Sequence, residues 1–102
     1  MPSKTTNKFI FLDRDGTIIE DAGYIHKIKD LKFLPSAVSG LKKLQQLGYK
    51  FIIISNQAGI ARGLYSSKDA ETFNRELTVR LAKSGVKIKK IYICPHHPDF
   101  TG

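Results

Sequence analysis

The sequence predicts an α/β fold in which two helices connect three parallel strands. Three short apolar runs, rich in β-branched and aromatic residues, are continuous rather than alternating, which is typical of strands that helices cover on both faces. Two stretches with apolar residues at helical spacing lie between these runs. The order strand, helix, strand, helix, strand favours a parallel sheet with right-handed crossovers.

The predicted strands are the three apolar runs themselves: Phe9–Leu12, Phe51–Ile54 and Ile91–Cys94. The first helix is expected from about Ser36 to Leu47, with Ser36 as its N-cap and Gly48 as its stop. The second helix is expected from about Ser67 to Lys83, with an inner face made of Phe73, Leu77 and Leu81.

The composition indicates one small globular domain with a large positive charge. The chain has 102 residues, 41% of them hydrophobic and 25% charged, and its formal net charge is +8. The lysines are dispersed, so a solvated basic face is the favoured interpretation and an anionic small molecule the next. Nucleic acid is the least favoured partner, because no nucleic-acid-binding module accompanies the charge.

Cysteine content and hydropathy favour a cytoplasmic protein. Cys94 is the only cysteine, so an internal disulfide is excluded, which fits a reducing compartment. The polar N-terminal residues have no apolar signal region, and no apolar run is long enough to cross a membrane. We therefore expect a cytoplasmic protein without a membrane partner.

Each predicted strand ends in polar residues, which are Asp13 and Asp15, then Ser55, Asn56 and Gln57, and finally Cys94, His96 and His97. Because the carboxyl ends of parallel strands meet at one edge of a sheet, where α/β proteins bind ligands, we expect these side chains to gather there. The long connection from Asp13 to Pro35 is also typical of a functional loop at that edge.

The two carboxylates one residue apart need a positive group to relieve their repulsion. Alternation along an extended backbone would send Asp13 and Asp15 to the same side, where Mg²⁺ would favour their oxygens. With a phosphate ester bound, one carboxylate could attack phosphorus and the other protonate the leaving alkoxide. An acidic turn that follows a strand, with Gly16 as turn residue, explains the spacing equally well.

Other polar residues near this edge could bind phosphate. Ser55 and Asn56 could donate hydrogen bonds to a phosphoryl oxygen, although on their own they fit ordinary turn residues better. Arg62, flanked by Gly59 and Gly63, could bind phosphate through its guanidinium fork, although a solvated arginine is more common in a loop.

Cys94 and His96 have the spacing of two zinc ligands. A tetrahedral Zn²⁺ site usually needs four, and only His97 and the distant His26 remain as further soft ligands. The residues alone favour a free cysteine beside two surface histidines.

Four segments together resemble the haloacid dehalogenase-like phosphohydrolases. They are "FLDRDGTI", with the DxDGT motif, "EDAGYIH", "IIISNQAGIARG" and "YICPHHP". The full set is similar to the D-glycero-D-manno-heptose 1,7-bisphosphate phosphatases and the related histidinol-phosphate phosphatases. The resemblance covers Phe9 to about Pro98 and implies a parallel, three-layer α/β/α, Rossmann-like sheet.

The resemblance implies a role for each matching residue. Asp13 would be the nucleophile, Asp15 the general acid and then base, and Ser55 would hold the phosphoryl group. Asp13, and Asp15 through its backbone carbonyl, would bind Mg²⁺, whereas Cys94 and His96 would bind a structural Zn²⁺. The substrate-binding residues would be Asp21, Ala22, Gly23, Tyr24, Ser55, Asn56, Gln57 and Ala58, to which we add Arg62 as a phosphate ligand.

The chain lacks segments that the resemblance leads us to expect. A Cys-x-Cys pair, a substrate-contacting Arg-Lys and an acidic fourth motif have no counterpart before Gly102. We therefore expect residues 1–102 to be the N-terminal portion of a phosphatase domain, with an incomplete sheet. Its first strand would then be an exposed apolar edge, through which we expect the chain to self-associate.

The sequence thus favours a Mg²⁺-dependent phosphatase of a small phosphorylated metabolite. The resemblance points to the 7-phosphate of heptose 1,7-bisphosphate, a lipopolysaccharide precursor, cleaved through a phospho-aspartyl intermediate. Histidinol phosphate is the alternative substrate. Two further hypotheses remain: an inactive phosphate-binding fragment, and an interaction module that uses the basic surface.

Overall fold

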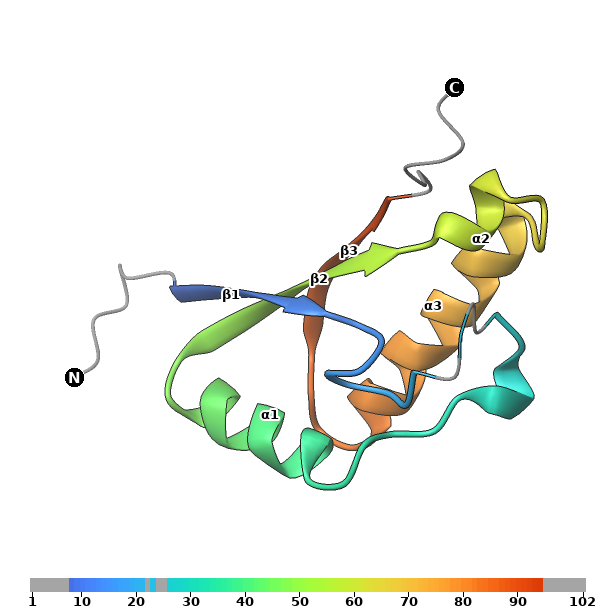
Figure 1. Ribbon diagram of the computed structural model, residues 1–102. Coiled ribbons are helices and arrows are strands. Elements are labelled where there is room, and N and C mark those ends of the chain that lie inside the picture. Colours follow the sequence, from blue (N-terminus) through green and yellow to red (C-terminus); the bar gives the residue numbers. More distant parts are fainter. Residues whose placement is uncertain (1–7, 22, 24–25, 95–102) are drawn as a thin grey trace.

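The structure is a small parallel sheet with its helices on one side. This computed structural model describes residues 8–21, 23 and 26–94. Strands β1 (Lys8–Asp13), β2 (Tyr49–Asn56) and β3 (Ile88–Cys94) are all parallel and lie in the order β1-β2-β3 (Figure 1). The predicted α/β class and parallel sheet are confirmed, and each strand is longer than its apolar run.

Two long helices form the crossovers between the strands. Helix α1 (Ala37–Gln46) connects β1 to β2, and α3 (Ser67–Lys83) connects β2 to β3, close to the predicted ranges. A four-residue helix α2 (Ala58–Ala61) and a 3₁₀ turn η1 (Ile28–Asp30) were not predicted, because neither is long enough to show a periodic apolar pattern.

The two long helices begin in different ways. Ser66 caps α3, since its hydroxyl accepts from the Asp69 N–H at 3.0 Å while the Asp69 carboxylate accepts from the Ser66 N–H at 3.1 Å. Ser36 is the N-cap residue of α1, as predicted, but it does not cap the helix through its side chain. Ser36 precedes the helix in a left-handed conformation, with φ of 67°, and its side chain makes no capping hydrogen bond.

Both long helices pack on the same face of the sheet. Phe73, Leu77 and Leu81 of α3 are fully buried, which confirms the predicted inner face of that helix. They join a core that contains Leu41 of α1, Phe51 and Ile53 of β2, and Ile18, Ile19 and Leu31 of the long β1–α1 connection. That connection is therefore partly structural.

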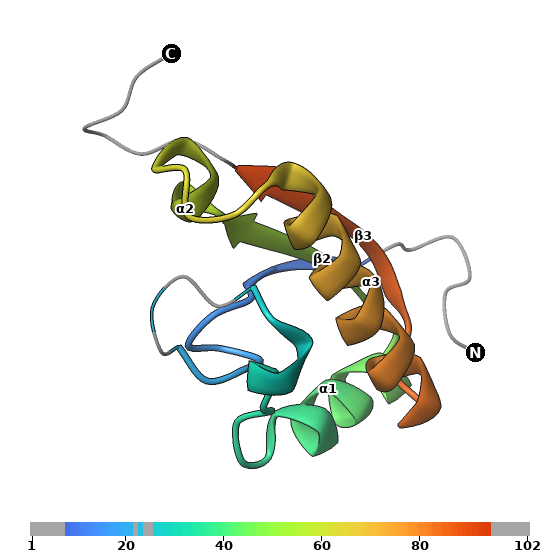
Figure 2. The ribbon, with the colours of Figure 1, turned by 90° about the vertical axis from the view of Figure 1, so that its right-hand side faces the viewer.

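The opposite face of the sheet is open among the described residues, so the prediction of strands buried on both faces is wrong. Phe9, Phe11 and Tyr92 are 41%, 64% and 47% exposed, whereas Phe51 and Ile53 are fully buried on the helical face. The reason is topological: two successive crossovers of the same hand, made in the same direction across the sheet, place both helices on one face (Figures 1 and 2).

Candidate active site

The carboxyl ends of the strands meet at one edge, as parallel pairing requires. Asp13 pairs with Ile54 in the register of β1 and β2, and Asn56 pairs with Cys94 in that of β2 and β3. The backbone N–H of Gln57 also donates to the Cys94 carbonyl at 2.7 Å, which joins the two strand ends beyond the sheet. This edge carries most of the polar residues that the sequence singles out.

The two carboxylates at this edge differ in their surroundings. Asp13 is the last residue of β1 and is exposed, whereas Asp15 lies in the turn that follows and is 22% exposed. In this turn Gly16 has φ of 82° and its N–H donates to the Ile19 carbonyl at 2.8 Å. The turn thus uses the left-handed conformation that glycine adopts without strain.

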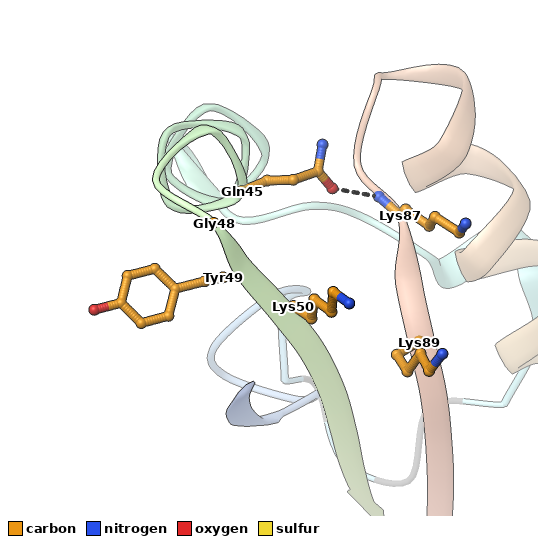
Figure 3. A pocket seen from close by; sticks show the side chains of 6 residues that line it. All are labelled: Gln45, Gly48, Tyr49, Lys50, Lys87 and Lys89. Carbon is orange, nitrogen blue, oxygen red and sulfur yellow. Dashed lines mark hydrogen bonds between the residues drawn. The ribbon is translucent and has the colours of Figure 1, made fainter. Parts of the chain in front are cut away.

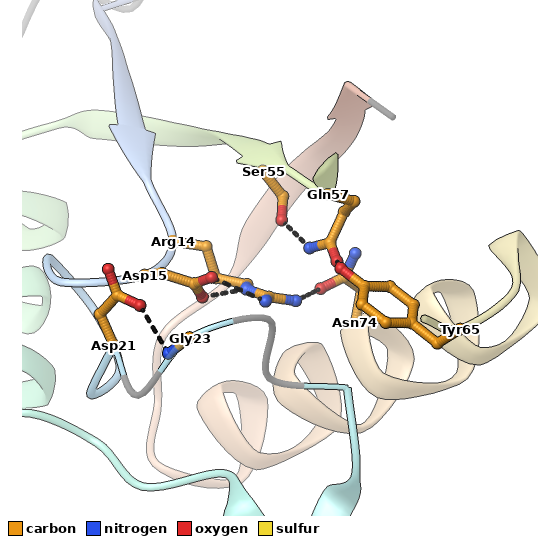
Figure 4. A network of polar contacts seen from close by, with 8 residues as sticks. All are labelled: Arg14, Asp15, Asp21, Gly23, Ser55, Gln57, Tyr65 and Asn74. Carbon is orange, nitrogen blue, oxygen red and sulfur yellow. Dashed lines mark hydrogen bonds and ion pairs between the residues drawn. The ribbon is translucent and has the colours of Figure 1, made fainter. Parts of the chain in front are cut away.

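Arg14, between these carboxylates, is the buried centre of a polar network (Figure 4). It is 1% exposed. Its Nε and Nη2 donate to the two oxygens of Asp15 at 2.5 and 3.0 Å, and its Nη1 donates to Asn74 Oδ1 on α3 at 2.9 Å. The guanidinium carbon lies 4.7 Å from the centre of the Phe73 ring. Arg14 therefore joins the end of β1 to the inner face of α3.

Gln57 extends the network to the end of β2. We assign its amide with the oxygen toward Arg14, because the opposite orientation would face the amide NH₂ against the guanidinium. The oxygen then accepts from Arg14 Nη1 at 2.8 Å and Nη2 at 3.1 Å. In either orientation the amide contacts the Ser55 hydroxyl and the Tyr65 hydroxyl, the latter at 2.5 Å.

Ser55 is held within the same network. It is 1% exposed, and its hydroxyl is engaged by Gln57. A contact between Ser55 and a phosphoryl group, as the resemblance implies, therefore requires its hydroxyl to turn away from Gln57. That contact stays a prediction.

Tyr65 closes the network on the side of α2. Its ring is buried and stacks on His26 at 4.5 Å between ring centres, with 13° between the planes. The ring lies so close to Gly59 that a Cβ at that position would overlap it. Gly59 is thus required by the approach of an aromatic ring.

The remaining predicted substrate residues lie around this edge. Asp21 is exposed, and its carboxylate accepts from the Gly23 N–H at 3.1 Å, which forms an Asx turn. Asn56 and Arg62 are exposed, at the end of β2 and just after α2, and Ala58 is the first residue of α2. Ala22 and Tyr24 lie outside the described residues.

The oxygen donors at the edge fit a hard cation. Of the proposed zinc ligands, only Cys94 is among the described residues. The exposed carboxylate of Asp13, with oxygens of Asp15 two residues further on, is the type of donor set that Mg²⁺ prefers. Cys94 is an exposed free thiol at the end of β3, whereas His96 and His97 lie outside the described residues. The described residues contain no group of three or more His, Cys, Asp or Glu side chains placed to hold a metal.

A basic hollow lies at the other end of the sheet, where β2 and β3 begin. It has a volume of about 360 Å³ and is lined by Gln45, Gly48, Tyr49, Lys50, Lys87 and Lys89 (Figure 3). The lysines give it positive charge, but no carboxylate or other candidate catalytic group lines it.

Among the described helices, none combines the length and apolar character needed to cross a membrane.

Sequence reasoning missed three members of the network: Arg14, Tyr65 and Asn74. Two signals were available. Arg14 stands between the two acidic residues that needed a positive neighbour, and Asn74 is a polar residue beside Phe73 on the buried face of a helix. Tyr65 gave no comparable signal, because it lies in the short connection between α2 and α3, which has no periodic apolar pattern.

Replacing Gly59 with alanine tests the packing of this network. The added Cβ overlaps the Tyr65 ring, so the ring must move and its hydroxyl must leave Gln57. We expect Gly59→Ala to lower the free energy of unfolding by about 1–3 kcal/mol in urea denaturation. Gly40→Ala is the control: Gly40 lies in α1 with open space around it, and we expect a gain of up to about 1 kcal/mol. Equal stability of Gly59→Ala and the wild-type chain would contradict the packing described.

Curated relatives share this sequence over most of its length. The chain is 48% identical over 92 residues to a D-glycero-alpha-D-manno-heptose-1,7-bisphosphate 7-phosphatase of Photorhabdus laumondii. It is 41% identical over 92 residues to the D-glycero-beta-D-manno-heptose-1,7-bisphosphate 7-phosphatase of the same organism. Each match covers 90% of this chain, but only 50% and 49% of the relatives. The chain thus spans about half the length of these proteins.

The fold and a family model agree with these matches. A crystal structure of D,D-heptose 1.7-bisphosphate phosphatase from B. bronchiseptica, complexed with magnesium and phosphate, superposes with a TM-score of 0.83 at 30% identity. The match covers 90% of this chain and 52% of that one. The model of the polynucleotide kinase 3 phosphatase family matches residues 8–99. The chain therefore belongs to the polynucleotide kinase 3 phosphatase family, with the haloacid dehalogenase-like fold of its heptose bisphosphate phosphatase relatives.

Proposed function

We propose that this chain carries the nucleophile and the acid–base group of a Mg²⁺-dependent sugar phosphatase, similar to enzymes that act on D-glycero-D-manno-heptose 1,7-bisphosphate. The observation that carries the proposal is the pair of carboxylates, Asp13 and Asp15, at the carboxyl edge of a parallel sheet. Relatives named as heptose bisphosphate 7-phosphatases, at up to 48% identity, support the 7-phosphate as the group removed.

The proposed reaction uses the two carboxylates in sequence. A carboxylate oxygen of Asp13 attacks phosphorus, and the bond between phosphorus and the sugar oxygen breaks. Asp15 gives its proton to the leaving alkoxide, and its carboxylate then accepts a proton from the water that hydrolyses the phospho-aspartyl group. Inorganic phosphate leaves, and both carboxylates return to their starting forms. Mg²⁺, held by the Asp13 carboxylate and the Asp15 backbone carbonyl, would offset the repulsion between the negative phosphate and the Asp13 carboxylate.

The residues around the edge would bind the rest of the substrate. We assign the phosphoryl group to Ser55 and Arg62, and the sugar to the segments 21–24 and 55–58. The exposed thiol of Cys94 supports one ligand of a structural Zn²⁺, with His96 as the second. This zinc would order the chain beside the site without taking part in the reaction. We also propose a cytoplasmic location, which the single cysteine of the sequence, Cys94, fits.

Phosphate release from a panel of substrates tests the proposal. The panel consists of the two anomers of heptose 1,7-bisphosphate, histidinol phosphate and a 3′-phosphorylated oligonucleotide. We expect Mg²⁺-dependent release that is fastest with a heptose bisphosphate and is abolished by a chelator. Asp13→Asn should lower kcat by roughly 10³-fold or more, because it removes the nucleophile. Asp30→Asn, an exposed residue of η1, is the matched control and should leave kcat unchanged.

Each other outcome has a definite meaning. Faster release from histidinol phosphate or from the oligonucleotide would replace the substrate assigned here. Mg²⁺-dependent binding of phosphate without turnover would identify the chain as a phosphate-binding portion whose remaining groups come from elsewhere. Neither turnover nor Mg²⁺-dependent phosphate binding would contradict the proposal.

We also propose that the isolated chain self-associates through the sheet. Among the described strands β1 has no neighbour on one side, and its residues Phe9 and Phe11 are exposed on the open face. An apolar edge strand of this kind pairs readily with another chain. Ile52 and Ile54 of β2 lie on the same open face of the sheet as Phe9 and Phe11. They are only partly buried, so they extend the exposed apolar area of that face.

Sedimentation velocity of two variants tests this association. We expect the wild-type chain to sediment as a dimer or larger species, and Phe11→Gln to shift it toward the monomer. Leu47→Gln is the control, because Leu47 is equally exposed, at 67% against 64%, but follows α1 on the other side of the sheet. A compact wild-type monomer at high protein concentration would overturn the proposal.

A further inference from the structure

The reaction proposed above gives no role to Arg14, although this residue is more deeply buried than either carboxylate beside it. Arg14 has 1% exposure in a turn, and a buried guanidinium is costly unless every N–H group has a partner. All five N–H groups have one: two go to Asp15, two to Gln57 and one to Asn74. Such complete pairing indicates a built site.

We propose that Arg14 is a positioning residue, which holds the carboxylate of Asp15 in one orientation at the carboxyl edge of the sheet. This rests on the proposed role of Asp15 in phosphate ester hydrolysis. The two parallel hydrogen bonds, 2.5 Å from Nε to Oδ1 and 3.0 Å from Nη2 to Oδ2, fix both the position and the plane of the carboxylate. A single bond would leave it free to rotate.

The guanidinium is itself fixed from two elements. Asn74 and Phe73 hold it from α3, and Gln57 holds it from the end of β2. These partners are buried, so the position of Asp15 is set by the packed interior of the domain and not by the turn alone. Gln57 also contacts the Ser55 hydroxyl, so the network fixes the positions of Asp15 and Ser55 relative to each other.

The same geometry leaves Asp15 able to meet a ligand. Arg14 engages both carboxylate oxygens from the buried side, yet the Asp15 side chain keeps 22% of its surface accessible. Each oxygen has a second lone pair that the fork does not use. The carboxylate is thus held from behind and open at the edge of the sheet, as an acid–base group requires.

Replacing Arg14 with lysine tests the geometry of the two-bond fork separately from its positive charge. Arg14→Lys keeps the positive charge but cannot form the two-bond fork. We expect it to lower kcat by about 10- to 100-fold with KM changed less than about threefold, and to move the pH profile of kcat. Arg80→Lys is the matched control, since Arg80 pairs with Glu76 at 2.8 Å on the exposed side of α3, and it should leave kcat and its pH profile unchanged. A variant Arg14→Lys with wild-type kcat and pH profile would overturn the proposal.

The Arg14 Nε–H resonance in NMR provides a readout that does not need turnover. We expect a resolved, slowly exchanging signal that is lost in Asp15→Ala, whereas the signal of Arg80 stays unchanged. A folded wild-type chain in which the Arg14 signal exchanges as fast as that of Arg80 would contradict the fork. Absence of turnover in the wild-type chain would count against the proposed function for this chain, and the NMR result alone would then decide whether Arg14 positions Asp15.

Discussion

The buried positive charge of Arg14 is the constraint on which the candidate site depends. Taking a guanidinium out of water costs several kcal/mol, so the chain must supply a negative partner and enough acceptors around it. Asp15 supplies the charge, and Asn74 and Gln57 supply neutral oxygens. Because these acceptors come from three separate elements, satisfying one side chain fixes how the turn after β1, the end of β2 and the helix α3 meet.

This constraint also answers the question of two carboxylates one residue apart. The positive group that relieves their repulsion in the structure is the arginine between them, which turns inward and takes Asp15 with it. Asp13 remains exposed at the end of β1. The two carboxylates therefore have different environments, which suits them to different roles: one open to a metal and to phosphorus, the other held in a fixed orientation for proton transfer.

The one-sided sheet is the second feature that shapes the molecule. Its strands are apolar on both faces, as in sheets that helices cover on both sides, yet α1 and α3 cover only one of them. The chain matches about half the length of its curated relatives. The exposed row of Phe9 and Phe11 is consistent with a surface that another segment or another chain covers.

The sequence was sufficient to predict the elements and the edge where the polar residues gather, but not the network that organises them. Long helices and apolar strands can be predicted because their apolar residues follow a regular pattern. Phe73, Leu77 and Leu81 were identified in this way. The Arg14 fork depends on contacts between residues as far apart as 14 and 74, which no local pattern records. The one-sided burial was missed because apolar residues on both faces give the same pattern whether or not both faces are covered.

The candidate site requires phosphate to bind at the carboxyl edge of the sheet, and chemical-shift mapping of the backbone amides tests this. Mg²⁺ and inorganic phosphate would be titrated together into the ¹⁵N-labelled chain. We expect the largest shifts in residues 13–21 and 55–62, with little change around Lys50, Lys87 and Lys89. Shifts concentrated at those lysines, with the carboxyl edge unaffected, would contradict it and would assign phosphate to the basic hollow instead.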